Sequence, residues 1–185
     1  MGIKMKKIIL IIFLSIILPK TSKAMSFYSG IGFGDSKGNI EGKNLKEKHI
    51  LTFAIGSSFS VPLFPIRVEA EYLNLDSEKE DYKTNLSGGG INTYVNLPLL
   101  PILVPYVGLG LSYLKEENNI TYPGITKTSS GKIVPQYILG FDLDLPTVII
   151  AGDMEYRYIT TSFEFDNKKS DSKYHIFMFK ARIKF

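Results

Sequence analysis

The feature that most constrains this chain is a rhythm of alternating apolar and polar residues, interrupted by connections that are short and long in turn. Alternation with a period of two places successive side chains on opposite faces of a β-strand. The short connections are rich in proline and cover residues 61–65, 98–101 and 145–147. The long connections are polar and cover residues 35–48, 76–85, 115–132 and 160–173. This rhythm predicts an antiparallel meander with tight turns at one end and long loops at the other.

Eight segments of about nine to twelve residues carry the alternation, and this length suits a tilted strand that crosses a bilayer. An even number of strands places both ends of the strand region beside the tight turns. The predicted strands are Ser26–Gly34, His49–Ser60, Ile66–Leu75, Leu86–Leu97, Val104–Leu114, Pro135–Leu145, Val148–Ile159 and Tyr174–Phe185.

Residues 1–24 have the pattern of a secretory signal peptide. Three lysines lie within the first seven residues, an apolar run covers Ile8–Leu18, and small residues flank Lys23. A membrane anchor is the alternative, but the run of about eleven residues is shorter than the roughly 20 that a spanning helix needs. We expect cleavage between Ala24 and Met25, which leaves residues 25–185 as one domain.

The excess of basic over acidic residues in the chain comes from this leader. The chain holds 22 Lys and Arg against 18 Asp and Glu, and five of the lysines but no acid lie in residues 1–24. The remaining residues, 17 basic and 18 acidic, show no excess of positive charge that would indicate nucleic-acid binding. The chain has no cysteine, which excludes disulfides and thiolate metal sites.

Two patterns favour a membrane barrel over a soluble lipocalin-type barrel, whose apolar face would point inward. Aromatic residues of the apolar face gather at the strand ends, as in the two interfacial girdles of a transmembrane barrel. They are Tyr72, Tyr113, Tyr137 and Tyr158 toward the long loops, and Phe27, Phe59 and Phe185 toward the tight turns. The sequence therefore predicts an all-β, eight-stranded, antiparallel, up-and-down transmembrane β-barrel.

The second pattern is that the polar face mixes charges of both signs with glycines. In a narrow lumen, glycines make room for long side chains, and opposite charges pair so that none is buried alone. We predict a lumen charge network, with a narrow conduction path as the alternative. Its members are Arg67, Glu69, Glu71, Asp142, Asp153, Glu155, Arg157, Lys180 and Arg182.

Three segments resemble the small opacity-type surface-antigen barrels of Gram-negative outer membranes: PYVGLGLSY at 105–113, DMEYRY at 153–158 and KARIKF at 180–185. The resemblance extends over the mature chain in rhythm and is sharp in its second half. It implies an outer-membrane location, contact with membrane lipid, and Phe185 as an assembly signal for the outer-membrane assembly machinery. Deleting Phe185 is then expected to impair insertion more than changing Lys184.

The resemblance further implies a surface antigen or adhesin-like protein that displays four extracellular loops, with host-cell surface proteins as partners and no catalytic residues or cofactor. A small channel and an outer-membrane enzyme are the alternatives. An enzyme would need a base such as His49 or His175 beside a nucleophile, for example Ser170 or Ser172. Two histidines without a clustered third ligand do not indicate a metal site.

The longest loop, residues 115–132, contains an unusually apolar tip. Tyr122, Pro123 and Ile125 could contact a partner or fold back over the barrel mouth. The sequence leaves both possibilities open.

Overall fold

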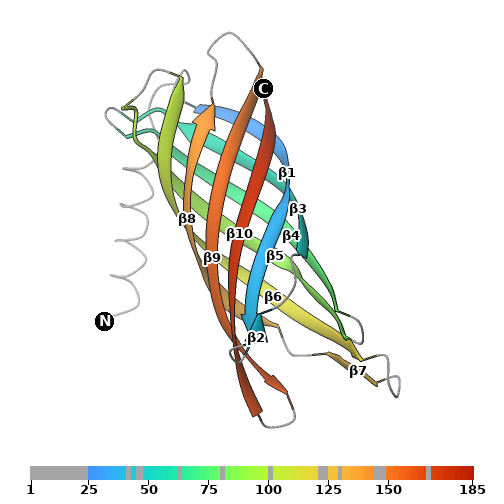
Figure 1. The fold of residues 1–185 in the computed structure, drawn as a ribbon. Helices are drawn as coiled ribbons and strands as arrows, with labels where there is room; N and C mark the ends of the chain where they lie inside the picture. Colours follow the sequence, from blue (N-terminus) through green and yellow to red (C-terminus); the bar gives the residue numbers. More distant parts are fainter. Residues whose placement is uncertain are drawn as a thin grey trace, which may run out of the picture.

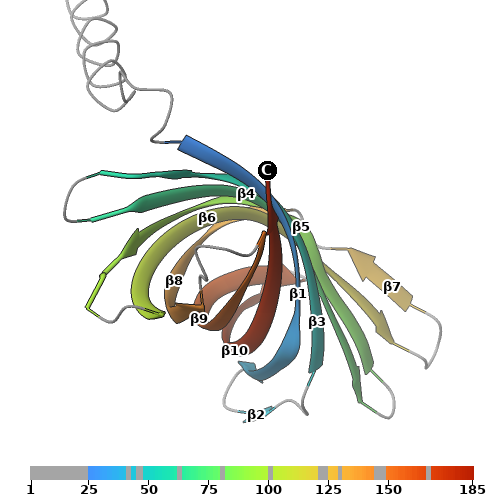
Figure 2. The same cartoon turned by 90° about the horizontal axis from the view of Figure 1, so that it is seen from above.

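A computed structural model describes residues 25–40, 43–44, 48–61, 64–79, 82–99, 102–120, 125–128, 131–143, 149–165 and 168–185. These residues form a closed barrel of tilted strands (Figures 1 and 2). No helix within them is long and apolar enough to cross a membrane. The predicted signal peptide and Ala24 lie outside the described residues, whereas Met25 begins the first strand.

Eight long strands make the wall of the barrel, and two short strands extend it. The long strands are β1 (Met25–Ile40), β3 (Lys48–Phe59), β4 (Ile66–Lys79), β5 (Tyr82–Asn96), β6 (Leu103–Ile120), β8 (Lys132–Leu143), β9 (Ile150–Phe165) and β10 (Lys168–Lys184). The short strands are β2 (Lys43–Asn44), which pairs with β1, and β7 (Ile125–Thr128), which pairs with β6.

The topology is up-and-down, because each long strand pairs antiparallel with the long strand that precedes it, and β1 closes the sheet against β10. At the turn end of the barrel, where β1 begins and β10 ends, Phe185 N donates to Phe27 O at 3.0 Å. The opposite end, called the hairpin end here, carries the connections β1–β3, β4–β5, β6–β8 and β9–β10 (Figure 1). The predicted eight-stranded barrel is therefore confirmed.

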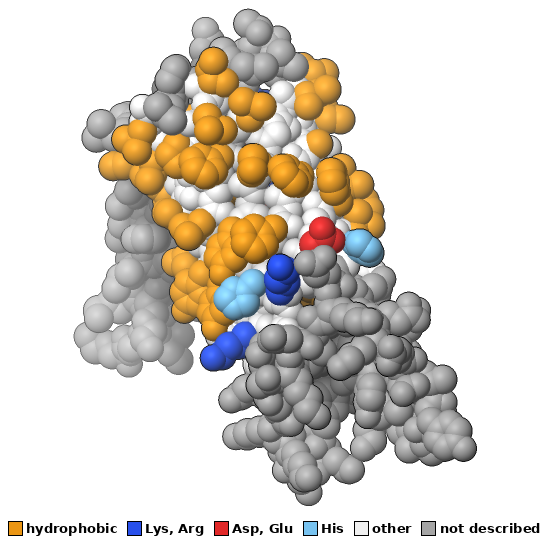
Figure 3. All heavy atoms as spheres, viewed as in Figure 1, with side chains coloured by type: hydrophobic (Ala, Val, Ile, Leu, Met, Phe, Trp, Pro, Cys, Tyr) orange, Lys and Arg blue, Asp and Glu red, His pale blue; other side chains and the backbone are white. Residues whose placement is uncertain are grey.

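The outer wall is apolar, as predicted. Large side chains stand outward from every long strand, among them Phe33 (61% exposed), Ile55 (67%) and Leu109 (64%). Figure 3 shows such residues as a broad belt on the front face of the barrel. A belt this large is typical of a surface that contacts lipid rather than water.

The predicted loop boundaries are wrong at the hairpin end, where the strands run further than the alternation does. β1 continues to Ile40 and β6 to Ile120, while β10 already begins at Lys168. The ladder of backbone hydrogen bonds needs no apolar face, so it continues beyond the apolar belt although the alternating pattern stops there. The segments 35–48, 76–85, 115–132 and 160–173 are thus largely extended hairpins rather than loops.

Candidate functional site

The interior of the barrel gathers all nine residues of the predicted charge network. They come from β4, β8, β9 and β10, point inward from alternate strand positions, and none exposes more than 6% of its surface. They are four cations and five carboxylates, and no other charged residue is buried among those whose side chains the structure describes. Charges removed from water need partners at hydrogen-bonding distance, and two linked groups provide them.

The first group lies midway along the barrel and centres on Arg157. Its guanidinium donates to both oxygens of Glu71 (Nη2–Oε2 2.7 Å) and, through Nε, to Glu155. Lys180 Nζ completes the group by donating to Glu69 Oε1 at 2.6 Å and pairing with Glu71 Oε2 at 2.9 Å. Gln136 Oε1 accepts a further bond from Arg157 at 3.0 Å. Two cations are thus shared among three carboxylates.

The second group lies nearer the turn end. Arg182 bridges two carboxylates, with Nε 2.6 Å from Asp153 Oδ2 and Nη2 2.5 Å from Asp142 Oδ1. Arg67 approaches the same pair, with Nη1 3.1 Å from Asp153 Oδ1 and 3.5 Å from Asp142 Oδ2. Asn96 Nδ2 also donates to Asp142 at 3.2 Å. Each carboxylate of this group therefore has more than one donor.

Three buried tyrosines contribute hydroxyl donors to the network. Tyr28 and Tyr94 donate to Glu69 at 3.2 and 2.9 Å, and Tyr106 donates to Glu155 Oε2 at 3.0 Å. The guanidinium of Arg67 also lies over the Tyr94 and Tyr106 rings, 4.7 and 4.8 Å from their centroids, within cation–π range.

The chain makes room for these rings with glycines. Each tyrosine is directly opposite a glycine of the next strand: Tyr28 faces Gly56, Tyr94 faces Gly108 and Tyr106 faces Gly140. A Cβ atom on Gly56 or Gly140 would lie 2.4 or 2.5 Å from the facing tyrosine. The lumen glycines thus make room for long neighbours in a specific way: a tyrosine ring lies across each of these glycines.

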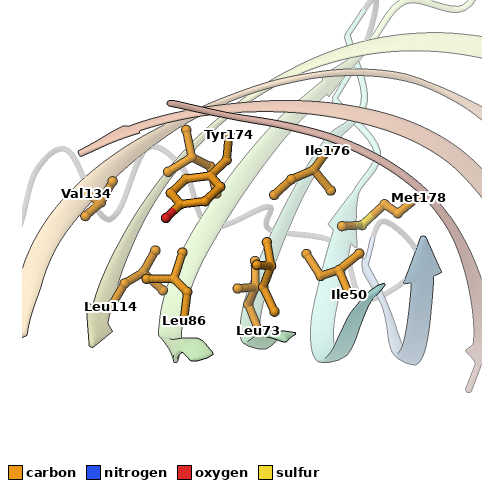
Figure 4. Packing of buried hydrophobic residues seen from close by; sticks show 10 residues of the cluster. Ile50, Leu73, Leu86, Leu114, Val134, Tyr174, Ile176 and Met178 are labelled. Carbon is orange, nitrogen blue, oxygen red and sulfur yellow. The ribbon is translucent and has the colours of Figure 1, made fainter. Parts of the chain in front are cut away.

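Sequence reasoning missed an apolar plug that fills the lumen toward the hairpin end. Figure 4 shows its side chains pointing toward one another across the interior. It consists of Ile50, Leu73, Leu75, Leu86, Leu114, Val134, Ile159, Tyr174, Ile176 and Met178, all at most 3% exposed. The sequence did carry a signal for the plug, because alternate residues of a strand share one face. Leu73 and Leu75 therefore continue the inward-facing positions of Glu69 and Glu71.

The plug and the charge network together fill the described part of the interior from the hairpin end toward the turn end. An apolar layer at the mouth keeps water from the ion pairs, which strengthens their attraction. An eight-stranded barrel is just wide enough for side chains to fill. Chemically, this arrangement suits a rigid scaffold better than a solute path.

The two histidines lie on the outer face of the barrel, and the side chain of Ser170 is not described. His49 Nδ1 is 3.0 Å from Asp35 Oδ1, and His175 Nδ1 is 2.7 Å from the Tyr156 hydroxyl. Ser172 is buried inside the barrel, on the face opposite to exposed His175. Within the described ranges, no group of three or more His, Cys, Asp or Glu is placed to hold a metal ion.

The remaining predicted residues lie at the two ends of the barrel. Phe185 is 77% exposed at the turn end, where its backbone pairs with Phe27. Its role as an assembly signal stays a prediction. Tyr122 and Pro123 lie outside the described residues, and Ile125 begins β7, with its side chain not described.

The fold and the lipid-facing belt define the class of the protein: it is an outer-membrane-type β-barrel with eight wall strands. No protein-family model matches the chain, and no curated protein matches it. Solved structures do match, and three of the similar structures are described next.

Neisserial surface protein A superposes with a TM-score of 0.67 and 17% identity, covering 86% of this chain and 97% of its own. Ail, the attachment invasion locus protein of Yersinia pestis, superposes with a TM-score of 0.55 and 13% identity, covering 86% and 99%. A major outer membrane protein from Thermus thermophilus gives 0.53 and 14%, covering 88% and 100%. At these identities the likeness establishes the fold, which is that of bacterial outer-membrane barrels.

Proposed function

We propose that this protein is a surface protein of a bacterial outer membrane, with both ends of the barrel domain in the periplasm, whose four hairpins bind a partner outside the cell. The observation that carries the proposal is the contrast between its parts. The lumen is filled by the plug and the charge network, whereas strands such as β6 and β10 extend past the apolar belt. A rigid barrel that displays variable connections is a common way to present binding residues.

The relatives support a role in surface contact. One is a surface protein and another an attachment invasion locus protein, and a structure of Ail holds the heparin analogue sucrose octasulfate. In this chain the four segments 35–48, 76–85, 115–132 and 160–173 carry twelve lysines and twelve acidic residues. Such a balanced surface favours a protein partner, such as a host-cell surface protein, over a polyanion.

Adhesion measurements test the proposal directly. A non-adherent host strain that expresses the protein should bind cultured cells more than the same strain with an empty vector. Replacing Tyr122 and Ile125 with serine should lower binding, because these residues give the longest hairpin segment its apolar tip. The matched control changes Phe163 and Phe165 to serine in the β9–β10 hairpin.

The outcomes separate the parts of the proposal. Loss of binding only in the Phe163 and Phe165 variant moves the contact to the β9–β10 hairpin and removes the role of Tyr122 and Ile125. Equal adhesion of the expressing and empty strains rejects the adhesin-like function.

Protease treatment of intact cells tests the orientation. We expect cleavage only within the hairpin-end segments, together with faster gel migration of unheated samples. Cleavage at residues 98–101 in intact cells would invert the orientation and place the turn end outside.

A further inference from the structure

A cluster of basic and aromatic side chains lies on the outer wall, where the apolar belt meets the hairpins. This basic–aromatic cluster consists of Lys37 on β1, Lys173 and His175 on β10, and Tyr156 and Tyr158 on β9. Lys37, Lys173 and His175 are exposed. Figure 3 shows lysine and histidine side chains directly beside the hairpin-side edge of the belt.

Strand register brings the three nitrogen-bearing side chains together. Lys37 is directly opposite His175 in the β1–β10 ladder, and Lys173 is the diagonal neighbour two residues away. In antiparallel sheets directly opposed Cβ atoms lie about 5 Å apart and diagonal positions about 7–8 Å apart. A group as small as a phosphate can therefore contact more than one of these side chains.

The neighbouring tyrosines fix the histidine ring. The Tyr156 hydroxyl is 2.7 Å from His175 Nδ1, and the ring centroids of Tyr158 and His175 are 5.1 Å apart. In the tautomer in which Nδ1 accepts a hydrogen bond from the Tyr156 hydroxyl, Nε2 carries the ring hydrogen and points it away from Tyr156. In that tautomer, His175 Nε2 is an oriented donor beside the two lysine ammonium groups.

An apolar hollow of about 260 Å³ adjoins the cluster on the side toward the turn end. Tyr156 belongs to both, and Phe177 packs against its ring with centroids 4.9 Å apart. Outward-facing Leu139, Phe141, Met154 and Phe179 also line the hollow. Since this part of the belt faces lipid, the hollow has the position and character that suit an acyl chain.

We propose that the basic–aromatic cluster binds the phosphate of an anionic membrane lipid whose acyl chain lies in the adjoining hollow, with phosphatidylglycerol as the probe. Charge complementarity supports this occupant, because cations at headgroup depth attract anionic lipids. The proposal is independent of the partner that the hairpins bind.

Native mass spectrometry of the refolded protein tests this site. The protein is released from nanodiscs made of equal parts phosphatidylglycerol and phosphatidylcholine with identical acyl chains, and the retained lipids are counted. We expect retention of phosphatidylglycerol over phosphatidylcholine. Lys37→Gln and Lys173→Gln should each lower that preference about five-fold, the contribution of one lysine near a membrane surface.

Lys115→Gln is the matched control, because Lys115 is an exposed lysine two residues beyond outward-facing Tyr113 on β6, at the same edge of the belt. It should leave the lipid preference unchanged. His175→Leu should lower the preference, since it removes the oriented donor. Compact migration of unheated samples verifies that each variant is folded.

Two results would overturn the proposal. The first is equal retention of the two lipids by the unaltered protein. The second is a loss in Lys115→Gln as large as in Lys173→Gln, which would indicate diffuse surface charge instead of a site. Neither result affects the adhesion test of the hairpins.

Discussion

Along β4, the inward-facing side chains change from charged to apolar within one strand, from Arg67, Glu69 and Glu71 to Leu73 and Leu75. The same change occurs on β9 after Arg157. On β10, which runs in the opposite direction, the apolar residues precede Lys180. The two halves of the lumen therefore share one strand face and differ in chemistry. The charged half lies inside the lipid belt. The apolar half lies toward the hairpin end of the lumen, where water would otherwise reach the ion pairs.

The two halves of the lumen should therefore respond differently to the loss of one side chain. The charged half is stabilised by directional bonds, so the loss of one partner leaves another group uncompensated. The apolar half is stabilised by packing, so the loss of one side chain leaves a space that its neighbours can partly fill. Four substitutions test this difference, in decreasing order of expected effect.

Arg157→Leu should cause the largest loss, about 3–5 kcal/mol in the free energy of unfolding, because it leaves Glu71 and Glu155 without their guanidinium partner. Urea titration of the protein in lipid vesicles measures it. Arg157→Lys, which keeps the charge, should lose less. An unchanged midpoint for Arg157→Leu would mean that the network does not stabilise the barrel.

Leu86→Ala should cost about 3 kcal/mol, since Leu86 is fully buried in the plug. The control is Leu111→Ala, at a residue that is 60% exposed on the lipid-facing wall, where lipid chains refill the space. Urea midpoints of the two variants give the comparison. If Leu111→Ala proved as costly as Leu86→Ala, the plug would have no special packing role.

Gly140→Val should destabilise the barrel by about 2 kcal/mol, because its Cβ would lie 2.5 Å from both the Tyr106 ring and Met154 O. Gly152→Val serves as the control, since the nearest atom to a Cβ there is Lys180 O at 3.9 Å. Thermal unfolding followed by gel migration distinguishes the two. Similar transition temperatures would contradict the ring-on-glycine packing.

Tyr106→Phe should have the smallest effect, about 1 kcal/mol, because Glu155 keeps Arg157 as a donor after the hydroxyl is lost. The urea midpoint should move only slightly and leave the folded gel form intact. A loss as large as that of Arg157→Leu would show that the hydroxyl network is as important as the ion pairs.

Conduction offers a separate check on the filled lumen. Planar-bilayer recording of the refolded protein should give no stable single-channel steps. Steady steps that disappear in Glu155→Ala would instead support the small-channel alternative and contradict the sealed arrangement of plug and network.

The sequence could predict the strand number, the outward and inward faces and the nine buried charges, because these follow from local alternation together with the aromatic residues at the strand ends and the mixed charges of one face. It did not predict the plug, since Leu73 and Ile159 lie at the ends of segments where the alternating signal fades. It also misplaced the hairpin boundaries near Ile40 and Ile120, because strand pairing in water requires no apolar face.

Alternation thus divided the side chains between two faces, since a period of two assigns each side chain to a face independently of its distant neighbours. The aromatic residues at the strand ends and the mixed charges of the polar face then indicated which face meets lipid and which lines the interior. Only the tertiary structure decided which charges meet and where the interior turns apolar. Arg157 and Glu71 are 86 residues apart, and closure of β1 onto β10 is needed before such partners share one lumen. Register around the closed barrel, which local sequence does not specify, sets those contacts.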